Sequence, residues 1–223
     1  MHVARLFLLV LVLALTACGG GDDEPAATDA TPGASIQLEG PGCEDVDAPE
    51  PKPDGGEKPP TAPLDAATTY RLVVKTNCGS FTIQLDQKTA PKTAASLVSL
   101  AENGFFDGTR FHRVVPGFVI QGGDPTGTGT GGPGYKTVDV PPAGTAYTKG
   151  VVAMAKAGSE APGTSGSQFF VVTGADSGLP PEYAVVGKVT EGLETVLAID
   201  KLGAGDGPPS QPVVIEKVTV ESS

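Results

Sequence analysis

From Tyr70 to its C-terminus the chain is a series of short apolar runs separated by glycine and proline. In Ser80–Asp86 apolar and polar side chains alternate, which is the pattern of a strand with one buried face. This run and the preceding apolar run, Tyr70–Thr76, flank the turn residues Asn77-Cys78-Gly79, which predicts a hairpin. Further short strands are predicted at Arg110–Val115, Phe118–Gly122, Gly150–Ala155, Gln168–Val172, Ala184–Val189 and Val213–Val220. Many short strands with few helices indicate an antiparallel sheet that curls into a closed or nearly closed barrel.

Two stretches of this region have the period of a helix instead. The first begins with Pro91, which suits the first helical position, and ends at Gly104. Its apolar face is formed by Ala94, Leu97, Val98 and Ala101. The second is Glu191–Leu202, which is followed by Gly203. We therefore expect a mainly β domain with two helices packed at the ends of the barrel.

The part of the chain before about Ala66 has a different composition. It is rich in proline, glycine, alanine and acidic residues and has few large apolar ones. Such a segment cannot bury enough apolar surface to fold alone, so residues 18–66 are predicted to be an extended, flexible tether. Residues 67–223 are long enough for one domain with its own core, and we assign them to a single folded unit.

The N-terminus has the layout of a secretory signal. Arg5 precedes the apolar run Leu6–Leu15, which is shorter than the roughly 20 residues that cross a bilayer. The run ends at Thr16-Ala17-Cys18, and a glycine-rich polar stretch follows. LTAC resembles the bacterial lipobox, which implies that residues 1–17 are a signal peptide and that Cys18 is lipidated. The alternatives are an uncleaved anchor or an ordinary signal peptide with an incidental Cys18.

Two further cysteines remain in an exported chain, Cys43 in the tether and Cys78 in the predicted turn. Two cysteines in an oxidising compartment can form a disulfide, which here would attach the tether to the domain. The sequence leaves this pairing open. Metal binding is not indicated, because one histidine, His112, remains after the signal and no CxxC or HxxxH spacing occurs. We expect no metal site and no cofactor.

The charge balance argues against several classes of partner. Asp and Glu number 26 against 15 Lys and Arg, which gives a formal net charge of −11. Phosphate backbones and anionic headgroups attract clustered basic residues, and the chain has no such cluster. We therefore expect no nucleic-acid partner, and membrane association only through the N-terminal lipid anchor.

The usual catalytic and nucleotide-binding motifs are also missing. His112 lies within an apolar strand and is interpreted as a structural residue rather than a base, and there is no GxSxG elbow, which disfavours a hydrolase. The glycine-rich string Gly127–Gly134 contains a GxGxxG-like pattern, but no amphipathic helix follows it and no GK[ST] is present. We interpret this string as a loop and not as a phosphate cradle.

The block FHRVVPGFVIQGGD, residues 111–124, resembles the signature of the cyclophilin family, FHRxxxxFxxQGGD. The segments APKTAASLVSLAENGFFDGTRFHR, GVVAMAKAG, GSQFFVVT and AVVGKVTEGLETV resemble other parts of that family in the same order, so the likeness extends from about Tyr70 to Val220. It implies a closed antiparallel eight-stranded barrel capped by two helices. It also implies peptidyl-prolyl cis-trans isomerase activity on proline-containing polypeptides, in this case exported ones.

The resemblance also implies roles for individual residues. Arg113 would be the electrostatic catalyst, with Phe118 and Gln121 as its partners. The remaining substrate-binding residues would be Met154, Ala155, Lys156, Gln168, Phe170, Leu179 and Tyr183. Of these, Phe118, Met154, Phe170 and Leu179 are expected to form an apolar pocket for the proline ring, while Ala155 and Lys156 would present backbone groups to the residues before proline.

Three positions depart from the better-known members of that family. Gly178 stands where they have tryptophan, Tyr183 where they have histidine, and Lys156 where they have asparagine. These changes affect the rim of the pocket. They leave room for a second hypothesis, a chaperone module that binds proline-containing peptides with little or no turnover. In either case we expect a monomer.

Overall fold

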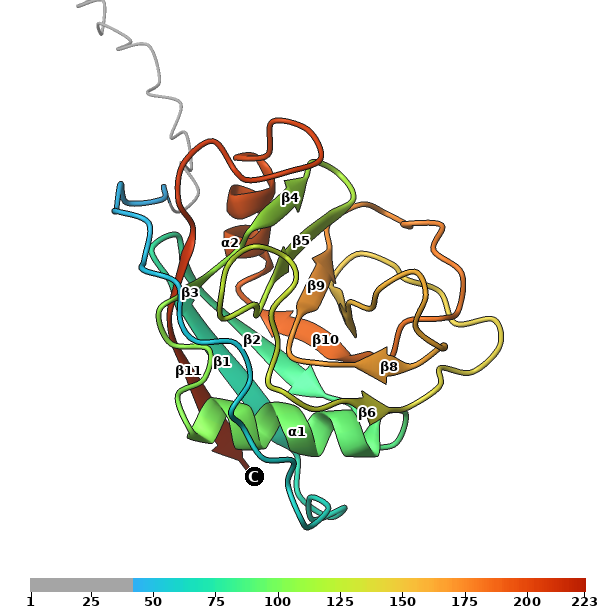
Figure 1. The fold of residues 1–223 in the computed structure, drawn as a ribbon. Helices are drawn as coiled ribbons and strands as arrows, with labels where there is room; N and C mark the ends of the chain where they lie inside the picture. The colour runs from blue at the N-terminus through green and yellow to red at the C-terminus, as the bar shows by residue number, and fades with distance from the viewer. Residues whose placement is uncertain (1–41) are drawn as a thin grey trace, which may run out of the picture. The chain divides into compact units, whose positions relative to one another are not determined.

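The computed structural model describes residues 42–223, and Figure 1 shows how they fold. The signal run, Cys18 and the first part of the predicted tether lie outside the described residues. Within the described part the fold is mainly β, with a nine-stranded antiparallel sheet in the order β3-β11-β1-β2-β10-β7-β9-β5-β4 and a two-stranded sheet β6-β8. The strands are β1 Tyr70–Thr76, β2 Gly79–Leu85, β3 Thr109–Arg110, β4 Arg113–Val115, β5 Val119–Gly122, β6 Thr137–Val138, β7 Val151–Met154, β8 Thr164–Ser165, β9 Phe169–Val172, β10 Val185–Glu191 and β11 Val214–Ser222.

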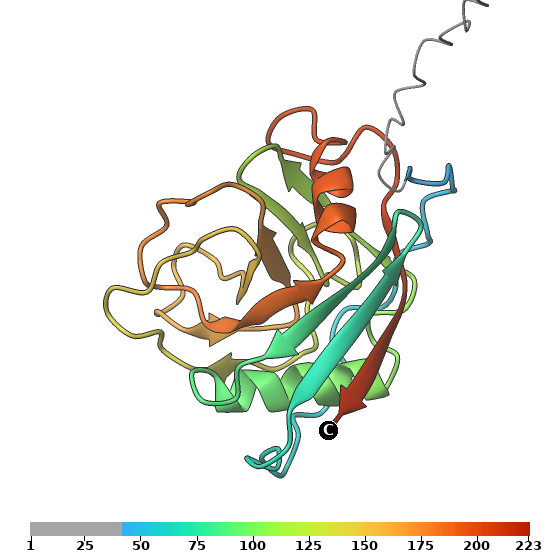
Figure 2. The ribbon, with the colours of Figure 1, turned by 180° about the vertical axis from the view of Figure 1, so that it is seen from behind.

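The hairpin predicted at the start of the domain is confirmed. β1 and β2 pair antiparallel, with Leu72 opposite Ile83 and Thr76 opposite Gly79 at the turn. The alternation of β2 places Phe81, Ile83 and Leu85 in the core. Figure 2 shows β11, β1 and β2 side by side at the back of the molecule, as their register requires.

Both predicted helices are present, at opposite ends of the sheet in both views. α1, Pro91–Glu102, begins with proline in its first turn and buries its apolar face. α2, Leu193–Asp200, begins two residues later than predicted because Gly192 precedes it in the left-handed region, with φ of 72°. A Cβ atom at this glycine would lie 2.2 Å from the carbonyl oxygen of Ser80, so only glycine fits between helix and hairpin.

The expectation of a closed eight-stranded barrel is wrong. The main sheet of the described residues has nine strands, and its ladder is open between the edge strands β3 and β4. These strands have two and three residues, and on its outer side each makes one isolated bridge in place of a ladder, Arg110 with Asp124 and Val114 with Gly207. The bridge of Arg110 joins β3 to the segment just after β5, and no strand pairing joins β3 to β4 among the described residues. The sheet is therefore a curled half-barrel.

Two apolar clusters fill the domain. The larger lies between the concave face of the sheet and α1 and contains Phe81, Leu100, Phe106, Phe111 and Ile215, each at most 1% exposed. The smaller lies on the other face and consists of Val119, Tyr147, Ala153, Phe170 and Val172. Partly buried side chains, including Phe118, Leu179 and Tyr183, pack against this second cluster.

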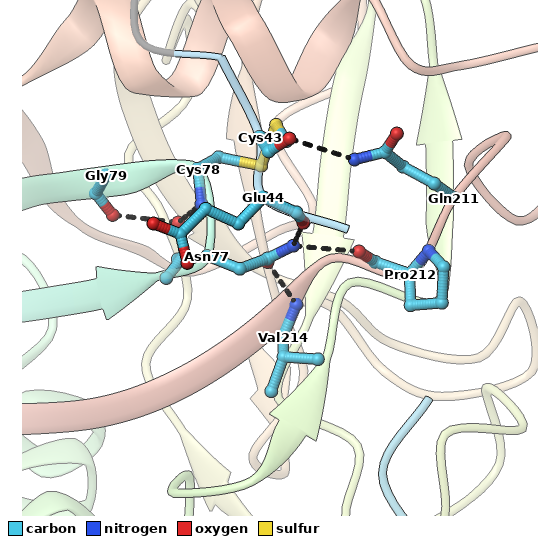
Figure 3. Close-up of a disulfide and its surroundings, with 9 residues drawn as sticks. Cys43, Glu44, Asn77, Cys78, Gly79, Gln211, Pro212 and Val214 are labelled. Carbon is cyan, nitrogen blue, oxygen red and sulfur yellow. Dashed lines mark hydrogen bonds between the residues drawn. A yellow bond between two sulfur atoms is a disulfide. The ribbon is translucent and has the colours of Figure 1, made fainter. Parts of the chain in front are cut away.

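The described end of the N-terminal segment is attached to the domain. Cys43 forms a disulfide with Cys78 in the β1–β2 turn, with an S–S distance of 2.02 Å (Figure 3). Beyond it, the Nζ atom of Lys52 donates hydrogen bonds to three backbone carbonyl oxygens just after α1, at Gly104, Phe105 and Asp107. Neither helix of the described residues has the length and apolar character needed to cross a membrane.

Candidate active site

Three of the side chains singled out in the sequence lie in one row across the sheet. Arg113 of β4 is directly opposite Gln121 of β5, and Gln121 is directly opposite Phe170 of β9. Directly opposed residues of adjacent strands project on the same face of a sheet. The next residue of the row is Ala153 of β7. The register of four strands therefore brings the arginine, the glutamine and the phenylalanine together.

The guanidinium group of Arg113 is held from two sides. Its Nη1 atom donates a hydrogen bond of 3.2 Å to Oε1 of Gln121. Its Nε and Nη2 atoms donate to the two carboxylate oxygens of Asp206, at 2.5 and 3.0 Å. This is the bidentate geometry that orients a planar guanidinium most firmly. The Arg113 side chain is 31% exposed and that of Asp206 is 67% exposed, so the pair lies at the surface.

Asp206 is a residue that sequence reasoning missed. It lies in the loop between α2 and β11, 93 residues after Arg113. The loop is fixed beside β4 by a backbone hydrogen bond of 2.7 Å from Val114 to Gly207. The ion pair with Arg113 lowers the pKa of the Asp206 carboxyl group, chiefly through the hydrogen bond. A lone aspartate between glycines carries no local signal for such a contact.

Gln121 is itself oriented by a chain of amide groups. Its Nε2 atom donates to Oε1 of Gln168 at 3.0 Å, and Nε2 of Gln168 donates to the carbonyl oxygen of Gly131 at 2.9 Å. The side-chain oxygen of Gln121 therefore faces Arg113, and the side-chain oxygen of Gln168 faces the NH2 group of Gln121. The result is a continuous path of hydrogen bonds from Arg113 to the glycine-rich loop.

The smaller apolar cluster supplies a surface beside this path. Phe118, Phe170, Leu179 and Tyr183 all belong to it or pack against it. The rings of Phe170 and Tyr183 meet edge to face, with centroids 5.7 Å apart. Tyr183 also packs edge to face on Tyr147, whose hydroxyl donates a hydrogen bond of 2.7 Å to the carbonyl oxygen of Tyr183. Tyr183 is thus a fixed aromatic wall next to Phe170.

Met154 does not lie at this surface, so its assignment to the pocket needs correction. Ala153 of β7 shares a face with Phe170, and the strand alternates, so the next side chain points to the opposite face. Met154 is accordingly 0% exposed and belongs to the larger cluster. Val119 packs in the smaller cluster with Phe170 and Phe118 and takes the place that the sequence analysis gave to Met154.

Lys156 is more deeply placed than a rim lysine usually is. Its side chain is 3% exposed, and its Nζ atom lies 3.1 Å from a carboxylate oxygen of Glu182. The same atom donates to the carbonyl oxygen of Glu160 at 3.1 Å and lies 5.5 Å from the centre of the Tyr183 ring. Ala155, just before it, is tied to the site because its N–H donates to the carbonyl oxygen of Gln168 at 2.9 Å.

A cavity of about 370 Å³ adjoins the amide chain. The glycine-rich loop forms one wall of it, and the segment that follows β7 forms another. Lys136 and Glu160, which make a salt bridge of 3.0 Å, stand at its edge. The residues that face this cavity include Gln121, Ala155, Lys156 and Gln168. It is a polar space next to the apolar surface.

His112 is not placed to act as a base. Both of its ring nitrogens are buried, and neither has a hydrogen-bond partner among the described residues. Burial lowers its pKa, against the opposing charge of Asp124. The imidazole is therefore neutral near pH 7 and serves as packing next to Arg113.

The comparisons with known proteins agree on one family. The family model for cyclophilin type peptidyl-prolyl cis-trans isomerase/CLD matches residues 71–220. Peptidyl-prolyl cis-trans isomerase A of Mycobacterium tuberculosis is 42% identical over 178 residues, which cover 71% of this chain and 94% of the relative. A peptidyl-prolyl cis-trans isomerase of Helicobacter pylori is 39% identical over 160 residues, which cover 71% and 91%.

The fold comparison gives the same result. The crystal structure of a cyclophilin type peptidyl-prolyl cis-trans isomerase of Cryptosporidium parvum matches with a TM-score of 0.63 and 31% identity, over 70% of this chain and 99% of that one. A second structure of that protein, determined in the presence of the dipeptide Ala-Pro, matches with a TM-score of 0.62. Because the family model matches more than half of this chain, residues 71–220, the chain belongs to the cyclophilin family of peptidyl-prolyl cis-trans isomerases.

Proposed function

We propose that the chain accelerates rotation about X-Pro peptide bonds and that Arg113 is its electrostatic catalyst. Rotation is slow because amide resonance must be broken, at a barrier of about 18–20 kcal/mol. In the twisted bond the imide nitrogen becomes pyramidal and exposes a lone pair. A donor that binds this lone pair favours the transition state over both planar forms. The observation that carries the proposal is the guanidinium of Arg113 held beside the apolar surface of Phe170.

The arginine retains donors for this task. A guanidinium group has five N–H bonds. The hydrogen bonds to Gln121 and Asp206 use one on each of the three nitrogens, so two N–H bonds have no partner among the residues that the structure describes. Because arginine stays charged at all relevant pH values, these donors need no proton transfer to work.

The proline ring is proposed to bind on the surface formed by Phe118, Val119, Phe170 and Leu179, with Tyr183 as its aromatic wall. Apolar contact there would hold the ring, while the residue before proline turns. Gln121 would orient Arg113 and bind the substrate backbone, and Gln168 would support it from behind. The residues before proline would pass Ala155 and Lys156, toward the polar cavity.

The test is the isomerisation rate of an Ala-Pro peptide with the purified chain and its Arg113→Ala variant. Loss of an electrostatic donor of this kind costs about 10²- to 10³-fold in kcat. Arg71, a partly exposed arginine of β1 whose side chain donates a hydrogen bond to Ser223, provides the matched control, and Arg71→Ala should keep the full rate. An equal rate in wild type and Arg113→Ala would exclude this mechanism.

A peptide-binding module with little turnover is the second candidate. The observation in its favour is that Asp206 occupies two nitrogens of Arg113 and neutralises its charge. The same assay separates the two functions. A binding module would retain an Ala-Pro peptide in equilibrium dialysis and leave the isomerisation rate at its spontaneous value.

We also propose that the protein is exported, is anchored by a lipid at Cys18, acts as a monomer and has exported polypeptides as substrates. The apolar run Leu6–Leu15 and the lipobox-like LTAC support the anchor. The disulfide between Cys43 and Cys78 supports the compartment, because such bonds persist where conditions are oxidising. Mass spectrometry of the mature N-terminus tests the anchor, and an unmodified Cys18 would overturn it. Light scattering of the detergent-free chain lacking residues 1–18 tests the monomer.

A further inference from the structure

The glycine-rich loop Gly127–Gly134, which binds no nucleotide in our interpretation, has a fixed shape. Its frame is the buried carboxylate of Asp124, which accepts hydrogen bonds from the N–H groups of Thr126 at 2.7 Å, Gly129 at 2.5 Å and Gly131 at 3.2 Å. Burial acts to raise the pKa of this carboxyl group, but the hydrogen bond from the Thr126 hydroxyl and the three backbone N–H groups together lower it. A Cβ atom at Gly131 would lie 2.3 Å from the same carboxylate, so the loop closes around it only with glycine there.

One carbonyl group of this loop, that of Gly131, determines which way the side-chain amides of Gln168 and Gln121 point. The carbonyl oxygen of Gly131 can only accept, so Gln168 must turn its NH2 group toward it and its oxygen toward Gln121. Gln121 must then turn its own NH2 group toward Gln168 and its oxygen toward Arg113. If the carbonyl moved away, both amides could reverse, and Gln121 would present a donor to a guanidinium that can only donate.

The loop is also held by residues 52–57 of the N-terminal segment. The backbone N–H groups of Lys52, Gly55 and Glu57 donate to the carbonyl oxygens of Pro125, Gly132 and Pro133 at 2.9, 2.9 and 3.0 Å. In the other direction, the N–H of Gly132 donates to the carboxylate of Asp54 at 2.8 Å. The N-terminal segment thus lies along the loop as an additional strand-like partner.

The fit between the two backbones is close. A Cβ atom at Gly134 would lie 3.1 Å from the Cα atom of Gly55, and both glycines have positive φ, at 92° and 75°. The segment is also attached on the side before Lys52. The disulfide of Cys43, shown in Figure 3, joins it to the β1–β2 turn, and Lys52 binds the three carbonyl oxygens after α1.

We propose that residues 52–57, a segment before the part of the chain that matches the family model, position Arg113 for catalysis. Asp54 and Gly55 are positioning residues. They hold Gly131 and its neighbours in place, Gly131 sets the direction of the two glutamine amides, and Gln121 orients the guanidinium. This inference rests on the proposed function of Arg113 and adds a part of the chain to the machinery.

The experiment compares Asp54→Ala, Asp54→Asn and the double variant Asp54→Ala/Gly55→Pro in the full chain. Proline at position 55 removes a second hydrogen bond and cannot adopt the positive φ, so it displaces the segment without touching the domain. The matched control is Asp47→Ala, an exposed aspartate that lies before residues 52–57. Two quantities are measured: kcat and KM for an Ala-Pro peptide, and the NMR signals of the Gln121 and Gln168 NH2 groups and of Arg113 Nε–H.

In the double variant we expect kcat to fall about two- to tenfold, the effect of about one net hydrogen bond, with KM changed less than about twofold. The NH2 signals of both glutamines should shift. Asp54→Asn keeps an acceptor oxygen and should restore both quantities relative to Asp54→Ala, while Asp47→Ala should match wild type. A merely stabilising segment would instead leave kcat and the NMR signals unchanged at a temperature where each variant is folded.

Unchanged kcat and unchanged amide signals in a folded double variant would overturn the inference. Failure of the proposed function has a different result, namely no acceleration by wild type. In that case the amide signals still report whether the segment controls the orientation of the two glutamines. Should the double variant fail to fold, Asp54→Ala alone decides by the same two measurements.

Discussion

The two sides of the Arg113 guanidinium are built in opposite ways. On one side Gln121 belongs to the sheet, and its neutral amide continues through Gln168 to the backbone of the glycine-rich loop. On the other side Asp206 lies in an exposed loop and contributes a full negative charge. The first support is partly buried and depends on hydrogen-bond direction. The second is solvated and depends on charge.

This difference indicates how the work is divided. The amide of Gln121 is neutral and partly buried, so water competes only weakly for its hydrogen bond to Arg113. This bond is therefore suited to set the orientation of the guanidinium. An exposed carboxylate is screened by water and salt, so its contribution is small even with ideal bidentate geometry. We therefore expect the catalytic geometry to depend mainly on the Gln121 side, with Asp206 as a secondary restraint.

The largest effect should follow from breaking the amide side. In Gln121→Leu the guanidinium loses one of its two partners, and the side-chain oxygen of Gln168 loses the hydrogen bond that Gln121 donates to it. Hydrogen bonds to charged groups contribute about 1.5–3 kcal/mol, so kcat for an Ala-Pro peptide should fall about 10- to 100-fold. Gln84→Leu, at an exposed position of β2, is the control and should behave as wild type. A loss of less than twofold would show that the sheet side does not fix the geometry.

An intermediate effect concerns the protonation of His112, the residue next to Arg113, and is measured as a change in the free energy of unfolding with pH. Burial lowers the pKa of His112 in the folded chain, so between that value and about 6.5 the unfolded chain binds more protons. The stabilising contribution of the neutral imidazole is complete above pH 6.5 and is lost as pH falls, at up to about 1.4 kcal/mol per pH unit. Urea unfolding of wild type and His112→Gln at pH 7 and pH 5 measures it. If the free energy of unfolding changed equally between pH 7 and pH 5 in wild type and His112→Gln, the prediction would be contradicted.

The smallest effect should follow from removing the charged side. Exposed ion pairs contribute about 0.2–1 kcal/mol, so Asp206→Ala should lower kcat by about 1.5- to 5-fold. Raising the salt concentration should bring wild type toward the variant, because salt screens the exposed pair. Asp176→Ala, an exposed aspartate whose carboxylate accepts from Gly178, is the control. A loss larger than that of Gln121→Leu would reverse the assignment of the two sides.

Much of the fold could be predicted because its signals are local. The alternation in β2, the proline at the start of α1 and the glycine before α2 each determine a nearby backbone conformation. The run Arg110–Val115 shows where this reasoning stops. It was predicted as one strand, but it is divided between β3 and β4, which pair with different partners. Pairing is decided by neighbours that are distant in the sequence, and so is the open edge of the sheet.

The site shows the same division. The resemblance to the family named Arg113, Gln121 and Phe170 as expected site residues, and the strand register of the folded chain places them in one row. The resemblance placed Met154 at the pocket, whereas the alternation of β7 turns that side chain into the larger cluster, and Val119 of β5 packs in the smaller cluster instead.

Only the tertiary structure decided what holds the arginine. Asp206 is 93 residues away from it in the chain, and Asp54 reaches the loop at Gly132 across 78 residues. A single aspartate between glycines or prolines looks like any turn residue, because its partner is chosen by where the folded backbone brings it. The sequence thus determined the strand pattern and the family of this protein, and the folded structure determined which residues hold Arg113, because those residues are distant from it in the chain.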